Sequence, residues 1–120
     1  MNAISWFEIP CKDLDRAERF YNTLLGKPLA RVVYDGAPMS VFPYEQGRGV
    51  GGCLLTAPHH KPAADGVRVY LAVTDLDAVL ARAKSAGGEV VLPRTAIGEH
   101  GFIGHVRDSE GNVLGLHLEK

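Results

Sequence analysis

Apolar and polar residues follow the same order twice along the chain. Each half opens with a stretch rich in β-branched or aromatic residues, at 4–10 and 67–73, which predicts a strand. An aspartate able to cap a helix comes next, and apolar residues then recur at helical spacing over 14–25 and 76–86. Glycine follows both segments, as is typical of helix ends. Two amphipathic helices are therefore predicted.

Three shorter strands are predicted after each helix. Turn residues separate them, including Asp35-Gly36, Gln46-Gly47 and Glu110-Gly111. The strands are expected at 29–34, 39–44 and 50–56 in the first half, and at 89–92, 102–107 and 112–118 in the second. Both halves thus have the order βαβββ.

The two halves are also related by sequence. Asp-Leu-Asp at 13–15 recurs at 75–77, an offset of 62 residues, and the same offset places Gly49 on Gly111. Each half is too small to hold a stable core alone, so we expect the two to pack as one domain. The predicted repeat units cover about 1–62 and 63–120.

Charge and composition narrow the classes of partner. The net charge is -1, and no two Lys or Arg residues are adjacent, so the basic surface of a nucleic-acid binder is not indicated. The longest apolar runs are too short to span a bilayer, and residues 1–6 lack the pattern of a signal peptide. We expect a cytoplasmic protein without a nucleic-acid or membrane partner.

The two cysteines and a histidine pair are candidates for redox chemistry or metal binding. Cys11 and Cys53 do not form a Cys-x-x-Cys motif, so free, partly buried thiols in a reducing compartment are expected. His59-His60 lies in the linker at 56–66, where further metal donors are missing. A solvated loop is favoured there over a pair of metal ligands.

Two motifs resemble those of a known superfamily. The run Asp-Leu-Asp-Arg-Ala-Glu-Arg-Phe-Tyr at 13–21, with Leu25-Gly26, is similar to the opening of vicinal oxygen chelate (VOC) proteins. These are the glyoxalase, bleomycin-resistance and extradiol-dioxygenase proteins. The closing run Asp-Ser-Glu-Gly-Asn at 108–112 resembles their final turn, with Ser109 where proline is more usual. The resemblance covers almost the whole chain.

The resemblance implies a fold and an assembly. It implies a single α+β VOC domain over residues 1–120, in which two βαβββ units form an incomplete mixed β-barrel with the helices outside. A cavity lies within the barrel. It also implies a homodimer, with the units paired either within one chain or between chains.

Many VOC enzymes bind a divalent metal that chelates two neighbouring oxygens of the substrate. The resemblance places the four ligand positions on Trp6, Cys53, Arg68 and Gly115. Indole, guanidinium and glycine are not ordinary metal ligands, and one thiolate does not make a site. We therefore expect no metal and no other cofactor, with a non-standard divalent metal site as the alternative.

Alternation along the strands then predicts what lines the cavity. The predicted lining residues are Trp6, Glu8, Arg68, Tyr70, Val113 and His117. Trp6 either stacks on a ligand or fills the space of the metal. Glu8 and Arg68 either pair with each other or contact a ligand, and Glu8 is also the candidate catalytic base, its pKa raised by an apolar cavity.

Tyr70 and His117 have structural alternatives, as a core residue and as an exposed edge histidine. The glycine-rich segment 95–104 is expected to be a loop leading into a strand. Alternatively it covers the cavity mouth, with His100 or Phe102 touching a ligand. Neither a phosphate-binding glycine loop nor a nucleophile elbow is present in the sequence.

Three functions stay open. The first is metal-free binding of a small organic molecule in the cavity, either to sequester it or to act on it with Glu8 as base. The second is a metal-dependent glyoxalase-type lyase or isomerase, or an extradiol-type dioxygenase, with ligands such as Glu8, His100 and His117. The third is a non-catalytic interaction domain whose cavity is packed core.

Overall fold

The computed structural model describes residues 2–45 and 49–120, so the predicted turn at Gln46-Gly47 lies outside the described residues. The elements are β1 (Trp6–Pro10), α1 (Leu14–Leu25), β2 (Ala30–Tyr34), β3 (Ala37–Val41), β4 (Gly51–Leu55), β5 (Tyr70–Ala72), α2 (Leu76–Ala83), β6 (Glu89–Ala96), the 3-10 turn η1 (Gly98–His100), β7 (Phe102–Arg107) and β8 (Val113–Leu118). The predicted order of elements is confirmed.

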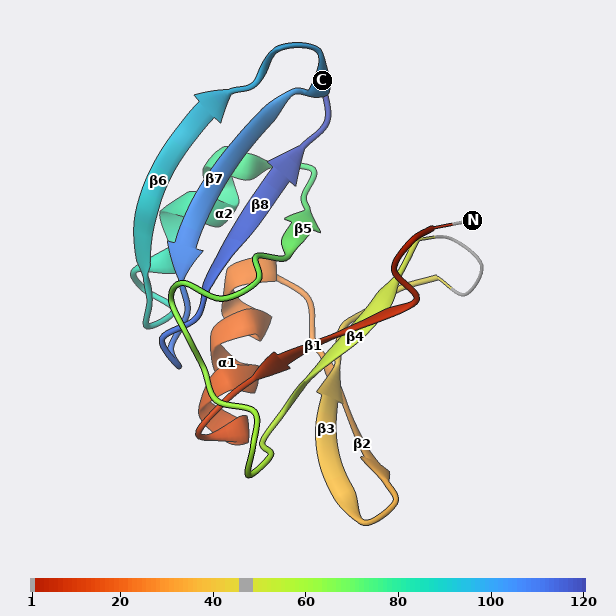
Figure 1. The fold of residues 1–120 in the computed structure, drawn as a ribbon. Helices are drawn as coiled ribbons and strands as arrows, with labels where there is room; N and C mark the ends of the chain where they lie inside the picture. The colour runs from red at the N-terminus through yellow and green to blue at the C-terminus, as the bar shows by residue number, and fades with distance from the viewer. Residues whose placement is uncertain (1, 46–48) are drawn as a thin grey trace.

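Four strands form an N-terminal sheet and four form a C-terminal sheet (Figure 1). The strand orders, β1-β4-β3-β2 and β5-β8-β7-β6, are equivalent. Each sheet is mixed, because β1 runs parallel to β4 and β5 runs parallel to β8. Glu8 lies opposite Cys53 and Tyr70 opposite Gly115, so the registers repeat the 62-residue offset. The α+β fold is confirmed, but the two sheets of one chain do not close on each other.

Local capping fixes where the helices begin. The Asp13 and Asp75 carboxylates accept hydrogen bonds from the backbone N–H groups of Arg16 and Ala78, at 3.0 and 3.1 Å. Gly26 ends α1 in the left-handed conformation, with φ of 70°. Both helices start where the capping residues predict.

Several boundaries differ from the prediction, among them β1, which begins at Trp6 rather than 4, and β3, which is Ala37–Val41 rather than 39–44. Helix α2 ends at Ala83 rather than 86, and β5 is reduced to Tyr70–Ala72, with Val67 fully exposed before it. Strand β6 runs on to Ala96, so the segment expected as a loop from residue 95 begins as strand. Register shifts in the β6–β7 ladder allow this longer strand to follow its partner.

Helices cover only one face of each sheet. The core consists of side chains from the helix-facing sides, including Ile9, Leu54 and Leu116, packed on Phe20 and Leu24 of α1 and their counterparts on α2. The opposite side of each sheet, which we call its helix-free face, is left largely open to solvent. Trp6 and Tyr70 lie on these faces and are 39% and 45% exposed.

A buried polar turn at 108–112 joins the two units. The Asp108 carboxylate accepts hydrogen bonds from the Tyr21 hydroxyl at 2.6 Å and from the backbone and side-chain nitrogens of Asn112 at 2.9 Å. The Asn112 amide also donates to the carbonyl of Pro10 at 2.8 Å. The end of β1 and the middle of α1 are thereby tied to the start of β8.

Glu110 completes this junction from the same turn. Its carboxylate accepts the backbone N–H groups of Lys12 and Asp13 at 2.8 and 2.9 Å and binds the Arg16 guanidinium, with Nε 2.7 Å from Oε2. Burial by itself raises the pKa of Glu110, but hydrogen bonds from Arg16, Asp13, Ser109 and Lys12 outweigh it and lower the pKa to about 2. Ionised Glu110 therefore stabilises the folded chain.

Replacing Glu110 is expected to destabilise the protein in a pH-dependent way. Because its pKa falls on folding from 4.5 to about 2, its contribution is fully present above pH 4.5 and is lost as the pH falls towards 2. We predict that Glu110→Gln lowers the free energy of unfolding at pH 7 by about 2–3 kcal/mol, a loss that shrinks towards pH 3. Urea unfolding of both proteins across this range measures it.

Glu89→Gln is the matched control, since Glu89 pairs with Arg107 at an exposed site. Its effect should be small at every pH, as for other surface ion pairs. A Glu110→Gln variant with wild-type stability at pH 7, or with a loss independent of pH, would contradict the role given to this carboxylate.

Candidate functional site

Polar groups converge on the helix-free face of the C-terminal sheet. Tyr70, Gly115 and His105 lie side by side on β5, β8 and β7. The Tyr70 ring crosses Gly115, where a Cβ atom would stand only 2.2 Å from a ring carbon. The Tyr70 hydroxyl thereby reaches His105 Nε2 at 2.8 Å. Glycine at this position is what permits the Tyr70–His105 pair.

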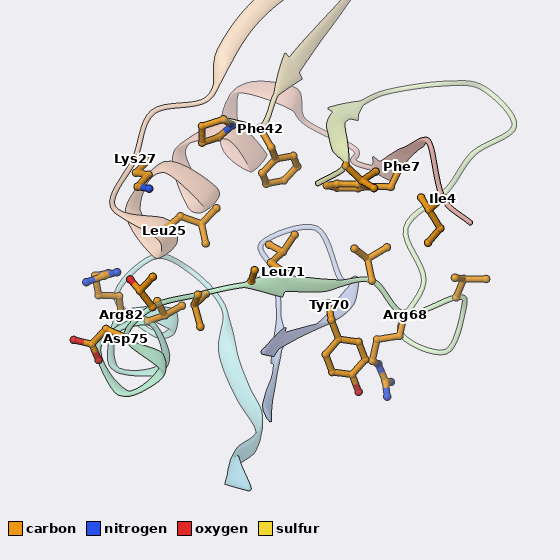
Figure 2. A pocket seen from close by; sticks show the side chains of 18 residues that line it. Ile4, Phe7, Leu25, Lys27, Phe42, Arg68, Tyr70, Leu71, Asp75 and Arg82 are labelled. Atoms are coloured by element: carbon orange, nitrogen blue, oxygen red, sulfur yellow. The ribbon is translucent and has the colours of Figure 1, made fainter. Parts of the chain in front are cut away.

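The protonation of His105 depends on its burial and on the nearby Arg68. Burial, and then the positive charge of Arg68, lower the pKa of His105 below its ordinary value. A neutral imidazole at pH 7 follows. Figure 2 shows the Arg68 and Tyr70 side chains on one side of β5 and Leu71 on the other. The face therefore offers a guanidinium, a phenol and an imidazole to the same region.

The helix-free face of the N-terminal sheet is aromatic and less polar. The Trp6 ring lies against Gly51, whose added Cβ would be 3.0 Å from the ring. Cys53 is fully buried, and burial, followed by the negative charge of Glu8, raises its pKa. Its thiol is therefore protonated at pH 7. This face therefore presents the Trp6 indole with the Glu8 carboxylate near it.

The predicted lining residues are only partly brought together. Arg68 and Tyr70 are neighbours, whereas Glu8 and Arg68, both within the described residues, form no ion pair within one chain. Glu8 instead borders a small cavity of about 50 Å³ together with Val113. Both residues sit where β1 and β8 meet, at the buried turn.

Phe102, the aromatic residue of the segment 95–104, does not reach these groups. Phe102 belongs to the helix-facing side, packed against the core under the Arg94 guanidinium at 4.1 Å. His117 Nε2 donates to the His100 carbonyl at 2.6 Å, which ties β8 to η1. Predicted ligand contact by Phe102 is therefore not supported, and His117 is held by the turn.

The family's metal does not fit this donor set. Of the four expected ligand positions only Cys53 carries a donor, its thiol is protonated, and the Tyr70 ring covers Gly115. Across residues 2–45 and 49–120, no group of three or more His, Cys, Asp and Glu side chains is placed to hold a metal ion. His59-His60 lies in a turn bridged to Ala57, as the loop interpretation predicts.

A larger cavity lies on the helix side, between the two units (Figure 2). It has a volume of about 740 Å³. We call it the inter-unit groove. Its walls are mainly apolar side chains, including Phe7, Leu25, Phe42, Leu71, Val73 and Val79. The helix-free faces nevertheless hold Glu8 and the Tyr70–His105 pair.

Sequence reasoning missed His105 and the groove. The strand 102–107 was predicted, but the partner of His105 depends on the register of β7 with β8 and on the absence of a side chain at Gly115. Alternation within β7 is the signal that could have found it. The groove depends on how the two units are placed, for which the sequence carries no local signal.

Equivalent βαβββ sheets with helices on one side define the glyoxalase/bleomycin-resistance class of fold. Residues 3–116 match the sequence model of the Glyoxalase/Bleomycin resistance protein/Dioxygenase superfamily. The chain belongs to this family, as the motifs at 13–21 and 108–112 indicated.

Relatives of known sequence are longer than this chain. It is 28% identical over 120 residues to the putative glyoxylase CFP32 of Mycobacterium bovis and of Mycobacterium tuberculosis. The match covers 93% of this chain but 44% of either relative, so the chain spans less than half of their length.

Solved structures share the fold. A glyoxalase/bleomycin resistance protein from Albidiferax ferrireducens has a TM-score of 0.76 at 18% identity, over 99% of this chain and 100% of that one. TnmS3, an antibiotic binding protein from Streptomyces, has a TM-score of 0.72 at 21% identity, over 100% and 98%. In the described part of this chain, neither helix is long and apolar enough to cross a membrane.

The influence of Arg68 on His105 can be measured directly. Because the Arg68 charge lowers the pKa of His105, Arg68→Met is expected to raise it towards the ordinary histidine value. Histidine NMR titration of wild type and variant reports the change. Arg94→Met, which removes a guanidinium from the helix side, is the control and should leave the His105 titration in place.

Proposed function

We propose that this chain binds a small, flat organic acid between its two helix-free faces, without the metal that many relatives use. The observation that carries the proposal is the Tyr70–His105 pair beside Arg68. A guanidinium supplies charge and two hydrogen-bond donors in a plane, which suits a carboxylate or another anionic oxygen. Trp6, 39% exposed on the other sheet, supplies a surface for stacking an aromatic ring.

The proposal includes a homodimer. Among residues 2–45 and 49–120, neither β1 nor β5 has a strand on its outer edge, and Trp6 and Tyr70 on the helix-free faces are exposed. A second copy can cover both faces by placing its C-terminal sheet against the N-terminal sheet of the first. Trp6 and Glu8 of one copy would then meet Arg68 and Tyr70 of the other.

The similarity to an antibiotic binding protein supports small-molecule binding as the function. TnmS3 is described as an antibiotic binding protein, and a cavity built from the helix-free faces would give this chain a comparable role. Sequestration needs only the binding groups. A catalytic version would use Glu8 as the base, because it is the carboxylate adjoining Trp6 and Cys53. Free, buried Cys11 and Cys53 are consistent with a cytoplasmic location.

Binding of 2-naphthoate tests this site. We predict that Arg68→Met weakens binding by about tenfold, because a charge-assisted pair is removed, and that Tyr70→Phe has a smaller effect. The neutral 2-naphthamide should bind weakly and be insensitive to Arg68→Met. Calorimetric titration measures each affinity, and Arg94→Met is the matched control.

The proposal that binding needs no metal is tested by exposing the protein to zinc, nickel, manganese and iron(II) and then removing the excess metal. Retention of metal near one equivalent, reduced by Glu8→Gln or His117→Ala, would contradict the proposal. It would favour glyoxalase-type or dioxygenase chemistry instead. Equal binding of 2-naphthoate by wild type and Arg68→Met would contradict the assignment of the anion site.

A further inference from the structure

The inter-unit groove adjoins the helix-free face of the C-terminal sheet along β5. Leu71 points towards Phe7 and Phe42, while the Arg68 and Tyr70 side chains project to the other side of the strand (Figure 2), and both of these residues also border the groove. Its volume of about 740 Å³ lies in the range of pockets that hold small organic molecules, roughly 300–1,000 Å³. The groove is thus a second candidate site, built on the sides of β1 and β5 that face the core.

One wall of the groove is held rigidly. The Phe7 ring lies flat on Gly52, where an added Cβ would be 2.4 Å from ring carbons. Phe7 stacks against Phe42 at 5.4 Å between centroids, and Phe42 meets Tyr21 at 5.3 Å. Tyr21 is in turn fixed by its 2.6 Å bond to Asp108. The apolar wall is therefore set before any ligand arrives, which lowers the cost of binding.

One end of the groove carries charge. Lys27 follows α1, Arg82 lies in the last turn of α2 and is bonded to the end of α1, and Asp75 precedes α2 (Figure 2). Within the described residues neither Lys27 nor Arg82 forms an ion pair, and Arg82 uses only Nε, donated to the Leu24 carbonyl at 3.1 Å. The Asp75 carboxylate caps α2. Two cations and one engaged carboxylate leave this end with a net positive charge.

We propose that the groove binds a medium-chain carboxylic acid. Its carboxylate lies between Lys27 and Arg82, and its hydrocarbon body lies along Phe7, Phe42 and Leu71. Two cations match a single carboxylate, whereas the nearby Asp75 repels a doubly charged phosphate. The lining between the charged end and Arg68 is mainly apolar, which suits a hydrocarbon chain better than a sugar.

Calorimetric titration with decanoate tests the site. Wild-type protein should bind decanoate, and 1-decanol should bind at least tenfold more weakly because it lacks the charge. Lys27→Met should weaken decanoate binding by about tenfold without changing decanol binding. Val73→Phe, which fills the groove, should weaken both. Lys84→Met removes a cation from the end of α2, outside the groove lining, and should have no effect.

Several outcomes would overturn the assignment. Decanoate that produces no binding heat, or that binds Lys27→Met as tightly as wild type, excludes the carboxylate site. Decanoate that converts dimer to monomer in sedimentation shows that a second copy occupies the groove instead. Circular dichroism melting of Val73→Phe and Lys27→Met confirms that each variant is folded, and a folded Val73→Phe that binds normally also contradicts the proposal.

Discussion

The buried turn at 108–112 is the interaction on which the rest of the structure depends. Asp108 and Glu110 are carboxylates removed from water. Asp108 is compensated by Tyr21 of the other unit and by donors of its own turn, and Glu110 by several donors from the other unit. This arrangement fixes the end of β1 and helix α1 against β8. It therefore decides that the units meet at one end and diverge from there, leaving two faces and one groove available.

Covering each sheet on one side only has consequences for function. The core is complete on the helix side, yet Trp6 and Tyr70 remain exposed. Such surfaces are costly in water unless a partner or ligand covers them. Glycine at 51 and at 115 allows an aromatic ring to lie across each sheet. Gly115 also stands at one of the expected metal-ligand positions. Because it has no side chain, it supplies no ligand and leaves room for the Tyr70–His105 pair.

Local features were predictable from the sequence, and long-range ones were not. Asp13, Asp75 and Gly26 set helix ends through contacts within a few residues, so α1 was predicted to the residue. Alternation placed Arg68 and Tyr70 on one face. Glu110 gave no sign of its role, because its partners lie more than ninety residues away in sequence. His105 and the groove likewise depend on register and on the packing of the two units.

Mixing two variants tests most directly whether the acid-binding cavity is built from two copies. Trp6→Ala on the N-terminal sheet and Arg68→Met on the C-terminal sheet are each expected to impair 2-naphthoate binding. If sheets pair between copies, a heterodimer of the two variants contains one intact site and one doubly changed site, so random mixing restores about one site in four. Recovery of that fraction after joint refolding is the predicted result. Binding by the mixture equal to the average of the separate variants would contradict the account.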